Sequence, residues 1–226
     1  MSIVRDVTAR LEAIYGVAEW HARFEPVDEL IACILSQHTS DTNSLRAFEQ
    51  LKAKYPTWDE VIQAETSDIA DAIRRGGLAD SKAPRIQEVL RRIREKEGTV
   101  DLSCLNAMSD ADARQYLMAL PGVGPKTAAI ALCFALNRPV IPVDTHIFRV
   151  SWRLGLFEKR IGEAKAHDVL QALIPVDIIY RFHVAIIQHG RQVCKAPTPR
   201  CGECVLSDLC RYYRSSSSQD TKTANA

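Results

Sequence analysis

Four cysteines near the end of the chain have the residue type and spacing of a metal site. They are Cys194, Cys201, Cys204 and Cys210, in the pattern Cys-x6-Cys-x2-Cys-x5-Cys. Such a compact set of thiolates suits either a tetrahedral zinc ion or an iron–sulfur cluster, and the spacing alone leaves both open. Disulfides are the other alternative. The first ten residues contain no apolar signal core, so we expect a reducing cytoplasm in which disulfides are rare.

The composition is that of an ordinary globular protein. The chain has 226 residues, 46% of them hydrophobic and 25% charged, which fits one large domain or two small ones. The longest uncharged apolar run, residues 128–136, is well short of the roughly 20 residues that span a membrane, so we predict no membrane role. The remaining cysteines, Cys33, Cys104 and Cys133, stand singly and are expected to be buried small hydrophobes.

Positive charge is concentrated in the second part of the chain. The net charge is +1, but residues 1–81 carry −6 and residues 82–226 carry +7. A polyanion would therefore bind the second part. Six basic residues in the segment 82–96 form either part of such a surface or an ordinary solvated helix face: Lys82, Arg85, Arg91, Arg92, Arg94 and Lys96.

Apolar residues recur three and four positions apart along most of the chain, which predicts an all-α protein. Capping patterns predict helix starts at Thr57, Ser67, Ser109 and Asp144. Glycines predict helix ends at Gly76–Gly77 and at Gly190. Residues 214–226 are serine-rich and lack large apolar side chains, so we expect a disordered tail.

Residues 120–128, Leu-Pro-Gly-Val-Gly-Pro-Lys-Thr-Ala, predict a tight turn between two helices. The two glycines permit unusual backbone dihedrals, and Pro125 suits the first position of the second helix. Free backbone N–H groups at the start of that helix can bind an anion such as a phosphate. The string therefore predicts a phosphate-binding hairpin.

The hairpin string resembles the helix-hairpin-helix element of the DNA glycosylase superfamily, and residues 143–150, Val-Asp-Thr-His-Ile-Phe-Arg-Val, resemble its aspartate loop. With the cysteine pattern, the resemblance is to the endonuclease III family and extends from about residue 8 to residue 213. It implies a 4Fe-4S cluster on the four cysteines. It also implies a two-lobed fold, with a six-helix domain at 23–137, a cluster domain formed by 1–22 and 138–213, and DNA in the cleft between them.

Lys126 and Asp144 are the candidate catalytic residues. A helix over 125–136 would carry the chain about 18 Å, and an extended return over 139–143 would recover roughly 16 Å, so the two residues can meet. A carboxylate stabilises the positive charge that glycosidic cleavage develops on the sugar. A neutral lysine amine can attack the anomeric carbon and form a Schiff base that promotes β-elimination. Alternatively, the lysine is a surface charge and the aspartate only an N-cap.

Within the family, a lysine at the position of Lys126 marks the bifunctional glycosylase–lyases, whereas adenine-mismatch glycosylases lack it. The resemblance assigns DNA contacts to the hairpin residues Gly122, Val123, Gly124 and Thr127. The basic residues Lys195 and Arg200, close to the cysteines, are predicted to contact phosphates.

Two further loops are predicted to face DNA, because an enzyme that extrudes a nucleotide must fill the space it leaves. Gly77–Leu78 resembles the family's glycine-leucine loop, so Leu78 either intercalates or simply packs at a helix end. Residues 35–41 resemble a second such loop. The family often has glutamine at the position of His38, and here Gln37 comes one residue earlier, so either residue is a candidate to probe the opposite strand.

The sequence therefore predicts a monomeric enzyme of the cytoplasm, associated with the nucleoid. It would excise oxidised pyrimidines from duplex DNA and then cleave the abasic site by β-elimination, as part of base excision repair. Its partner would be double-stranded DNA that contains damaged bases or abasic sites. The alternatives are a monofunctional glycosylase for mismatched or alkylated bases and a non-catalytic, cluster-bearing protein that only binds lesions.

Overall fold

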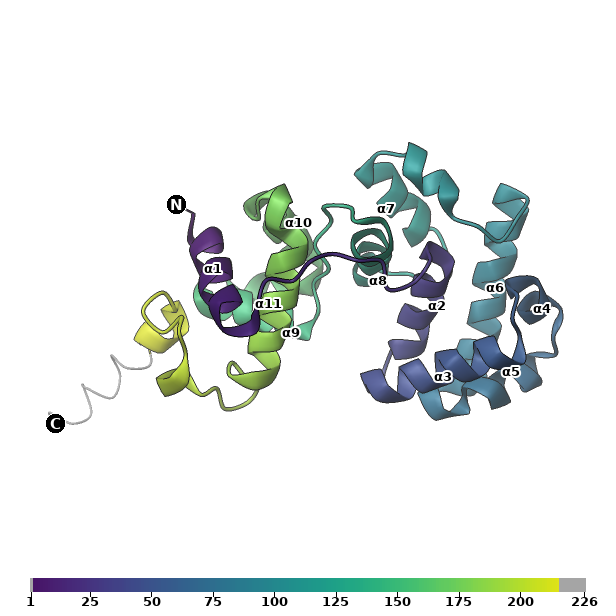
Figure 1. Ribbon diagram of the computed structural model, residues 1–226, viewed down its shortest axis with the longest axis horizontal. Helices are drawn as coiled ribbons and strands as arrows, with labels where there is room; N and C mark the ends of the chain where they lie inside the picture. Colours follow the sequence, from purple (N-terminus) through teal and green to yellow (C-terminus); the bar gives the residue numbers. More distant parts are fainter. Residues whose placement is uncertain (1, 216–226) are drawn as a thin grey trace, which may run out of the picture. The chain divides into compact units, whose positions relative to one another are not determined.

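The computed structural model describes residues 2–215, and within that range the regular structure is helical, without a β-strand (Figure 1). The prediction of an all-α protein is confirmed. Contacts between Cα atoms divide the chain into two compact units. One is His21–Arg138, and the other combines Met1–Trp20 with Pro139–Ala226.

The unit His21–Arg138 is built around one helix that is apolar on most sides. Its elements are α2 (Pro26–Ser36), α3 (Asp41–Lys54), α4 (Trp58–Gln63), α5 (Thr66–Ile73), η1 (Arg74–Gly76), α6 (Ala79–Glu97), η2 (Ser103–Ala107), α7 (Asp110–Met118), α8 (Pro125–Ile130) and the π-helix η3 (Ala131–Ala135). Leu30, Ile31 and Ile34 of α2 are fully buried. Because its apolar residues face several directions, α2 packs against α3, α6, α8 and η3.

The predicted helix boundaries in this unit are mostly confirmed. Thr57 forms a capping box with Glu60 at the start of α4, and the Ser109 hydroxyl accepts a hydrogen bond from the Asp112 N–H at the start of α7. The prediction at Ser67 is wrong. Helix α5 already begins at Thr66, because the carbonyl of Glu65 accepts the N–H of Ile69.

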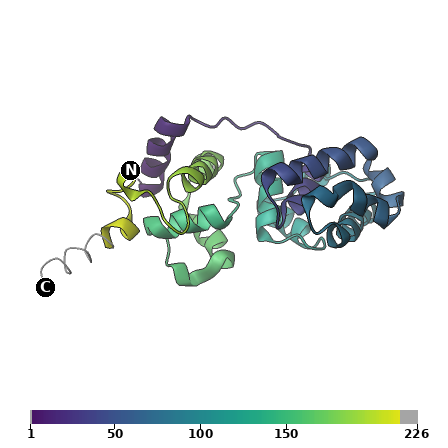
Figure 2. The same cartoon turned by 90° about the horizontal axis from the view of Figure 1, so that it is seen from below.

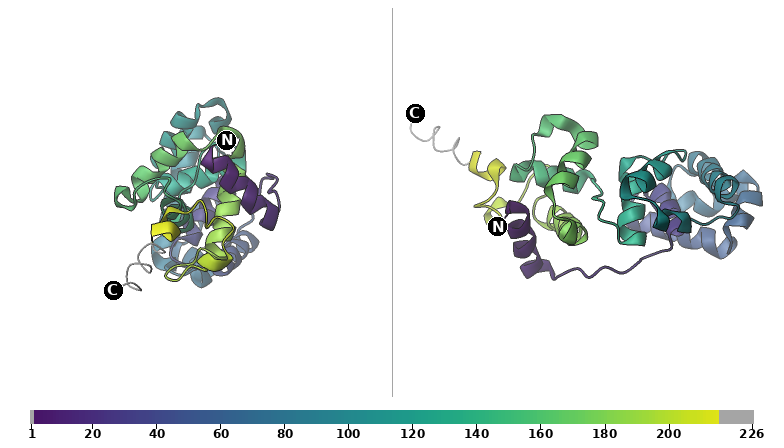
Figure 3. Two further views of the ribbon diagram at one scale, coloured as in Figure 1. Left: turned by 90° about the vertical axis from the view of Figure 1, so that its left-hand side faces the viewer. Right: turned by 90° about the horizontal axis from the view of Figure 1, so that it is seen from above.

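The second unit joins the two ends of the chain. Its elements are α1 (Ile3–Tyr15), α9 (Thr145–Leu154), η4 (Lys159–Ile161), α10 (Gly162–Leu173), η5 (Val176–Ile178), α11 (Ile179–Gln192) and η6 (Cys201–Glu203). Figures 2 and 3 show α1 beside the segments that follow α11. The fully buried Val7 and Leu11 lie on α1, and the Arg181 guanidinium of α11 binds both carboxylate oxygens of Glu12 at 2.6 Å.

Gly190 does not end a helix as predicted. Helix α11 continues through it to Gln192, and a Cβ atom at Gly190 would lie 2.9 Å from Nδ1 of His146. The missing side chain therefore allows α11 to approach α9 closely. Of the predicted disordered tail, residues 214 and 215 belong to a helical turn that begins at 211, and residues 216–226 lie outside the described residues.

No single helix in residues 2–215 has both the length and the apolar character needed to cross a membrane. The segments Lys159–Leu173 and Val176–Gln192, which meet at a bend of 111°, satisfy length and composition only as a pair.

Candidate functional site

The turn between α7 and α8 presents a lysine at the start of a short helix. Gly122 has a φ of +71°, a backbone conformation that favours glycine, and a Cβ atom there would lie 2.5 Å from Cδ of the Arg85 side chain. Gly124 is the N-cap of α8 and Pro125 occupies its first turn, as predicted. Lys126 follows with an exposed side chain.

Two of the hairpin residues that are predicted to contact DNA have buried side chains. Val123 and Thr127 are both buried. They can therefore meet a ligand only through their backbone, whereas the exposed Gly122 and Gly124 leave the turn accessible.

The helix that contains Lys126 has the predicted extent but not a regular α-helical backbone. The sequence predicts one helix over 125–136, and helical structure does reach residue 136, but α8 ends at Ile130 and the chain continues as the π-helix η3. The N–H of Arg138 donates to the carbonyl of Leu132 at 3.0 Å, and Asn137 before it has a φ of +51°, which is a Schellman-type end of the helical segment. Leu132 is fully buried, and η3 packs against α2, so the π-helical turn supplies an apolar side chain to the core.

Asp144 caps a helix in the other unit. Its Oδ1 accepts a hydrogen bond from the N–H of Ile147 at 2.7 Å, so the carboxylate serves as the N-cap of α9. The side chain is half-buried. In the extended segment before it, the N–H of Ile141 donates to Oε1 of Gln171 at 2.9 Å. Lys126 belongs to the unit His21–Arg138, and Asp144 belongs to the other unit.

An arginine connects the first turns of α9 to the cysteine segment. Arg149 donates from Nη2 to Nδ1 of His146 at 3.0 Å and from Nε to the carbonyl of Cys194 at 3.0 Å. Because a guanidinium only donates, Nδ1 of His146 accepts, and the neutral ring carries its proton on Nε2. Burial lowers the pKa of His146, Asp144 opposes that effect, and Arg149 adds to it.

The four predicted metal ligands surround one cavity. Cys194, Cys201, Cys204 and Cys210 are half-buried free thiols, and all of them line a cavity whose empty volume is about 390 Å³, open solvent included. Burial raises the pKa of Cys204 to about 11, and the neighbouring thiols also raise it. In residues 2–215, no group of three or more His, Cys, Asp or Glu side chains is arranged to hold a single metal ion.

A buried cation faces these thiols. Arg153 is only 7% exposed and donates from Nη1 to Sγ of Cys194 at 3.4 Å and to the carbonyl of Lys195 at 2.9 Å. Its Nε is buried without a hydrogen-bond partner among the described residues. On the other side, Sγ of Cys204 lies 3.5 Å from Nε2 of His189. This donor set suits an anionic group that is held by thiolates.

Comparisons with known proteins identify the family. Residues 31–175 match the family model of the HhH-GPD superfamily base excision DNA repair protein. Over 194 residues, 86% of each chain, the protein is 36% identical to endonuclease III of Thermotoga maritima. The chain belongs to the endonuclease III family. It is also 34% identical to endonuclease III of Escherichia coli over 83% of this chain and 84% of that one.

A solved structure of a trapped endonuclease III–DNA covalent intermediate has a TM-score of 0.81 and 30% sequence identity to this chain. The match covers 95% of this chain and 97% of that one. The predicted helix-hairpin-helix glycosylase fold is therefore confirmed.

In this member of the endonuclease III family, the two loops predicted to face DNA carry non-glycine residues with positive φ. These residues are His38, at +56°, and Leu78, at +52°. Leu78 is 57% exposed, which does not fit the alternative that it packs at a helix end. Gln37 is half-buried, and its Oε1 accepts from Nη1 of Arg85 at 3.1 Å while its Nε2 donates to the carbonyl of Gly122 at 3.4 Å.

Near the cysteines of this endonuclease III homologue, Lys195 and Arg200 are exposed, and Arg200 pairs with Glu203 at 3.7 Å. Sequence reasoning missed Arg149 and Arg153. Because they are four residues apart, both lie on one face of α9, and both donate hydrogen bonds to Cys194. Two arginines at this helical spacing are the sequence pattern that could have indicated them.

Proposed function

We propose that this protein is a bifunctional DNA glycosylase and abasic-site lyase of base excision repair, which removes oxidised pyrimidines from duplex DNA. The observation that carries the proposal is the exposed Lys126 at the start of α8, in a hairpin where Gly122 has a φ of +71°. The relatives named endonuclease III and the trapped covalent endonuclease III–DNA complex support it.

The chemistry follows from the lysine amine. The neutral Nζ of Lys126 attacks the anomeric carbon, and the damaged base leaves with the electron pair of the glycosidic bond. Ring opening gives a Schiff base, which makes the adjacent C2′ proton acidic. Loss of that proton expels the 3′ phosphate by β-elimination, and water then hydrolyses the Schiff base to release the enzyme.

Asp144 is proposed to stabilise the sugar as its positive charge develops. Its second role, capping α9, fixes the direction of the carboxylate, because one oxygen is held by the N–H of Ile147. A side chain that is already ordered loses little entropy when the substrate binds.

Asparagine at position 144 separates these two roles. Asp144→Asn is expected to lower base excision roughly 10²- to 10³-fold, since the charge is lost, while α9 keeps an equally good N-cap. Cleavage of a preformed abasic site should fall less, because no glycosidic bond has to break. Single-turnover rates on both substrates measure the loss of excision and of cleavage, and the melting temperature measures the stability of the protein.

Asp144→Ala, which also loses the cap, is expected to cost about 0.5–2 kcal/mol of stability beyond any cost of Asp144→Asn. Normal excision by the asparagine variant would remove Asp144 from the chemistry.

We also propose that Cys194, Cys201, Cys204 and Cys210 hold a 4Fe-4S cluster. The cavity between the four thiols, and the buried guanidinium of Arg153 directed at one of them, support an anionic, thiolate-bound group. When bound, the cluster would cross-link the segment 194–210. That segment carries the exposed Lys195 and Arg200, which would then be placed to contact phosphates.

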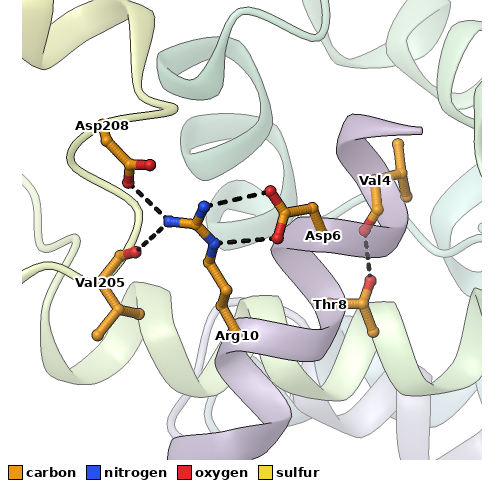
Figure 4. Close-up of polar contacts among 6 residues, drawn as sticks. All are labelled: Val4, Asp6, Thr8, Arg10, Val205 and Asp208. Atoms are coloured by element: carbon orange, nitrogen blue, oxygen red, sulfur yellow. Dashed lines mark hydrogen bonds and ion pairs between the residues drawn. The ribbon is translucent and has the colours of Figure 1, made fainter. Parts of the chain in front are cut away.

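The N-terminal helix holds the cysteine segment in place through Arg10 (Figure 4). Its Nη1 donates to Oδ1 of Asp208 at 2.7 Å and to the carbonyl of Val205 at 3.2 Å, and its Nε donates to Asp6 at 3.0 Å. Val205 and Asp208 both lie between the third and fourth cysteines. Contacts from α1 therefore restrict the loop that carries two of the ligands.

Removing these contacts should loosen the cluster. Arg10→Met is expected to lose visible cluster absorbance several-fold faster than the unaltered protein during incubation at raised temperature. The matched control is Arg5→Met, on the same helix, whose guanidinium binds Asp177, a residue outside the segment 194–210. Equal decay in the two variants would show that Arg10 has no specific role in retaining the cluster.

The enzyme is proposed to act as a monomer on double-stranded DNA that contains damaged bases or abasic sites, at the nucleoid in the cytoplasm. The test is an incision panel on duplexes with thymine glycol, dihydrouracil, uracil, oxidised guanine or an abasic site, with and without borohydride. We expect cleavage and a trapped complex with the oxidised pyrimidines and the abasic site. Base release without strand cleavage would instead indicate a monofunctional glycosylase, and lesion binding without turnover a non-catalytic protein.

A further inference from the structure

Lys82 is the first of two residues on α6 that connect the two loops predicted to face DNA, residues 35–41 and Gly77–Leu78. Although it lies in the basic segment 82–96, its side chain is only 2% exposed. Nζ donates to the carbonyl of Leu35 at 2.7 Å and to the carbonyl of Gly76 at 2.8 Å. Leu35 O belongs to the last turn of α2, where helix carbonyls lack partners within the helix and the helix dipole attracts a cation. Burial lowers the pKa of Lys82, and the neighbouring Arg85 lowers it further.

Each acceptor lies just before a residue with positive φ. Leu35 comes three positions before His38, and Gly76 comes two positions before Leu78. Positive φ is unfavourable for residues with a side chain, so both conformations depend on the surrounding structure. One buried ammonium group therefore connects the two loops at the points where each enters its strained conformation.

Arg85, almost one turn after Lys82, extends the connection to the hairpin. Its Nη1 donates to Oε1 of Gln37 at 3.1 Å, and its side chain packs against Gly122 so closely that a Cβ atom there would lie 2.5 Å from it. Nε2 of Gln37 in turn donates to the carbonyl of Gly122 at 3.4 Å. The amide of Gln37 is thus engaged within the protein, whereas the side chain of the neighbouring His38 is exposed.

We propose that Lys82 and Arg85 are positioning residues that hold the two lesion-probing loops and the hairpin in one arrangement, and so control engagement of damaged duplex DNA rather than the bond-breaking step. The inference deepens the proposed glycosylase function and rests on it. If the loops are already ordered in the free protein, they lose little conformational entropy when the nucleotide is extruded from the duplex.

The test compares a duplex substrate with a single-stranded one. Lys82→Met and Arg85→Met remove the cation but keep an unbranched apolar side chain. We expect kcat/KM on a thymine glycol duplex to fall roughly 10- to 100-fold, because each variant loses the hydrogen bonds that the charged group donates. An abasic site in a single strand does not have to be extruded from a duplex. Cleavage and borohydride trapping of that oligonucleotide should therefore stay within about twofold of the unaltered protein.

Three controls accompany this comparison. Arg85→Lys should recover much of the duplex activity, because a lysine can still donate to Gln37. Lys54→Met removes an exposed cation elsewhere in the same unit and should leave both activities unchanged. Amide hydrogen exchange over residues 36–40 and 77–79 should accelerate in Lys82→Met, a readout that needs no catalysis.

Unchanged duplex kcat/KM in Arg85→Met, equal losses on both substrates, or unchanged exchange of the two loops would each overturn the inference. If the unaltered protein neither cleaves nor traps either substrate, the proposed function fails, and the exchange measurement still decides whether Lys82 holds the loops.

Discussion

Replacing Lys126 with glutamine is expected to abolish the covalent complex that borohydride traps with damaged DNA, and to lower strand cleavage by at least roughly 10³-fold. Glutamine cannot form a Schiff base, so neither the trapped adduct nor the β-elimination that depends on it is possible. Lys126 is exposed and makes no contribution to the buried core, so the melting temperature should not change.

Arginine at the same position is the matched control, because it keeps the positive charge but stays protonated and cannot act as the amine nucleophile. Lys126→Arg should therefore also fail to trap DNA, yet bind an abasic duplex more tightly than Lys126→Gln, since it retains attraction to the phosphates. Trapping, cleavage and equilibrium binding are measured on the same oligonucleotide. A trapped adduct that survives in both variants would place the nucleophile at another residue.

The features that the sequence predicted well are those determined by neighbouring residues. The capping box at Thr57, the N-cap at Asp144 and the turn at Gly122 each depend on residues within a few positions. Helical periodicity in a chain of this composition likewise predicts all-α structure without knowledge of packing. Local signals of this kind can be read directly from the sequence.

The predictions that failed depend on residues far apart in the chain. Gly190 lies inside α11, where the close approach of His146 leaves little space for a side chain, and Lys82 is buried with a carbonyl 47 positions earlier among its acceptors. A basic residue in a charged helix is normally solvated, so nothing local distinguishes Lys82 from the other basic residues of the segment 82–96. The approach of Lys126 to Asp144 stays a prediction of the same long-range kind, and the π-helix η3 replaces the regular helix that it assumed.

Replacing one cluster ligand is expected to have the second largest effect. Cys204→Ser should lose most of its iron, sulfide and visible absorbance, and should lower the melting temperature of the protein by about 10 °C or more. Without the cluster, the segment 194–210 loses the cross-link between its four cysteines and keeps only protein contacts, among them those of Arg10, Arg149 and Arg153. Arg153 would then remain as a buried cation without its anionic partner, which is itself destabilising.

Cys104→Ser is the control for cysteine loss, because Cys104 is a half-buried thiol in the other unit and does not line the cavity. Its iron content and melting temperature should match those of the unaltered protein. Duplex binding provides the link to function: Cys204→Ser should bind more weakly and with a shallower salt dependence, because Lys195 and Arg200 lose their fixed positions near phosphates. Full iron content in Cys204→Ser would exclude this cysteine as a ligand. If the unaltered protein is colourless and contains stoichiometric zinc, the four cysteines hold a zinc ion and not an iron–sulfur cluster.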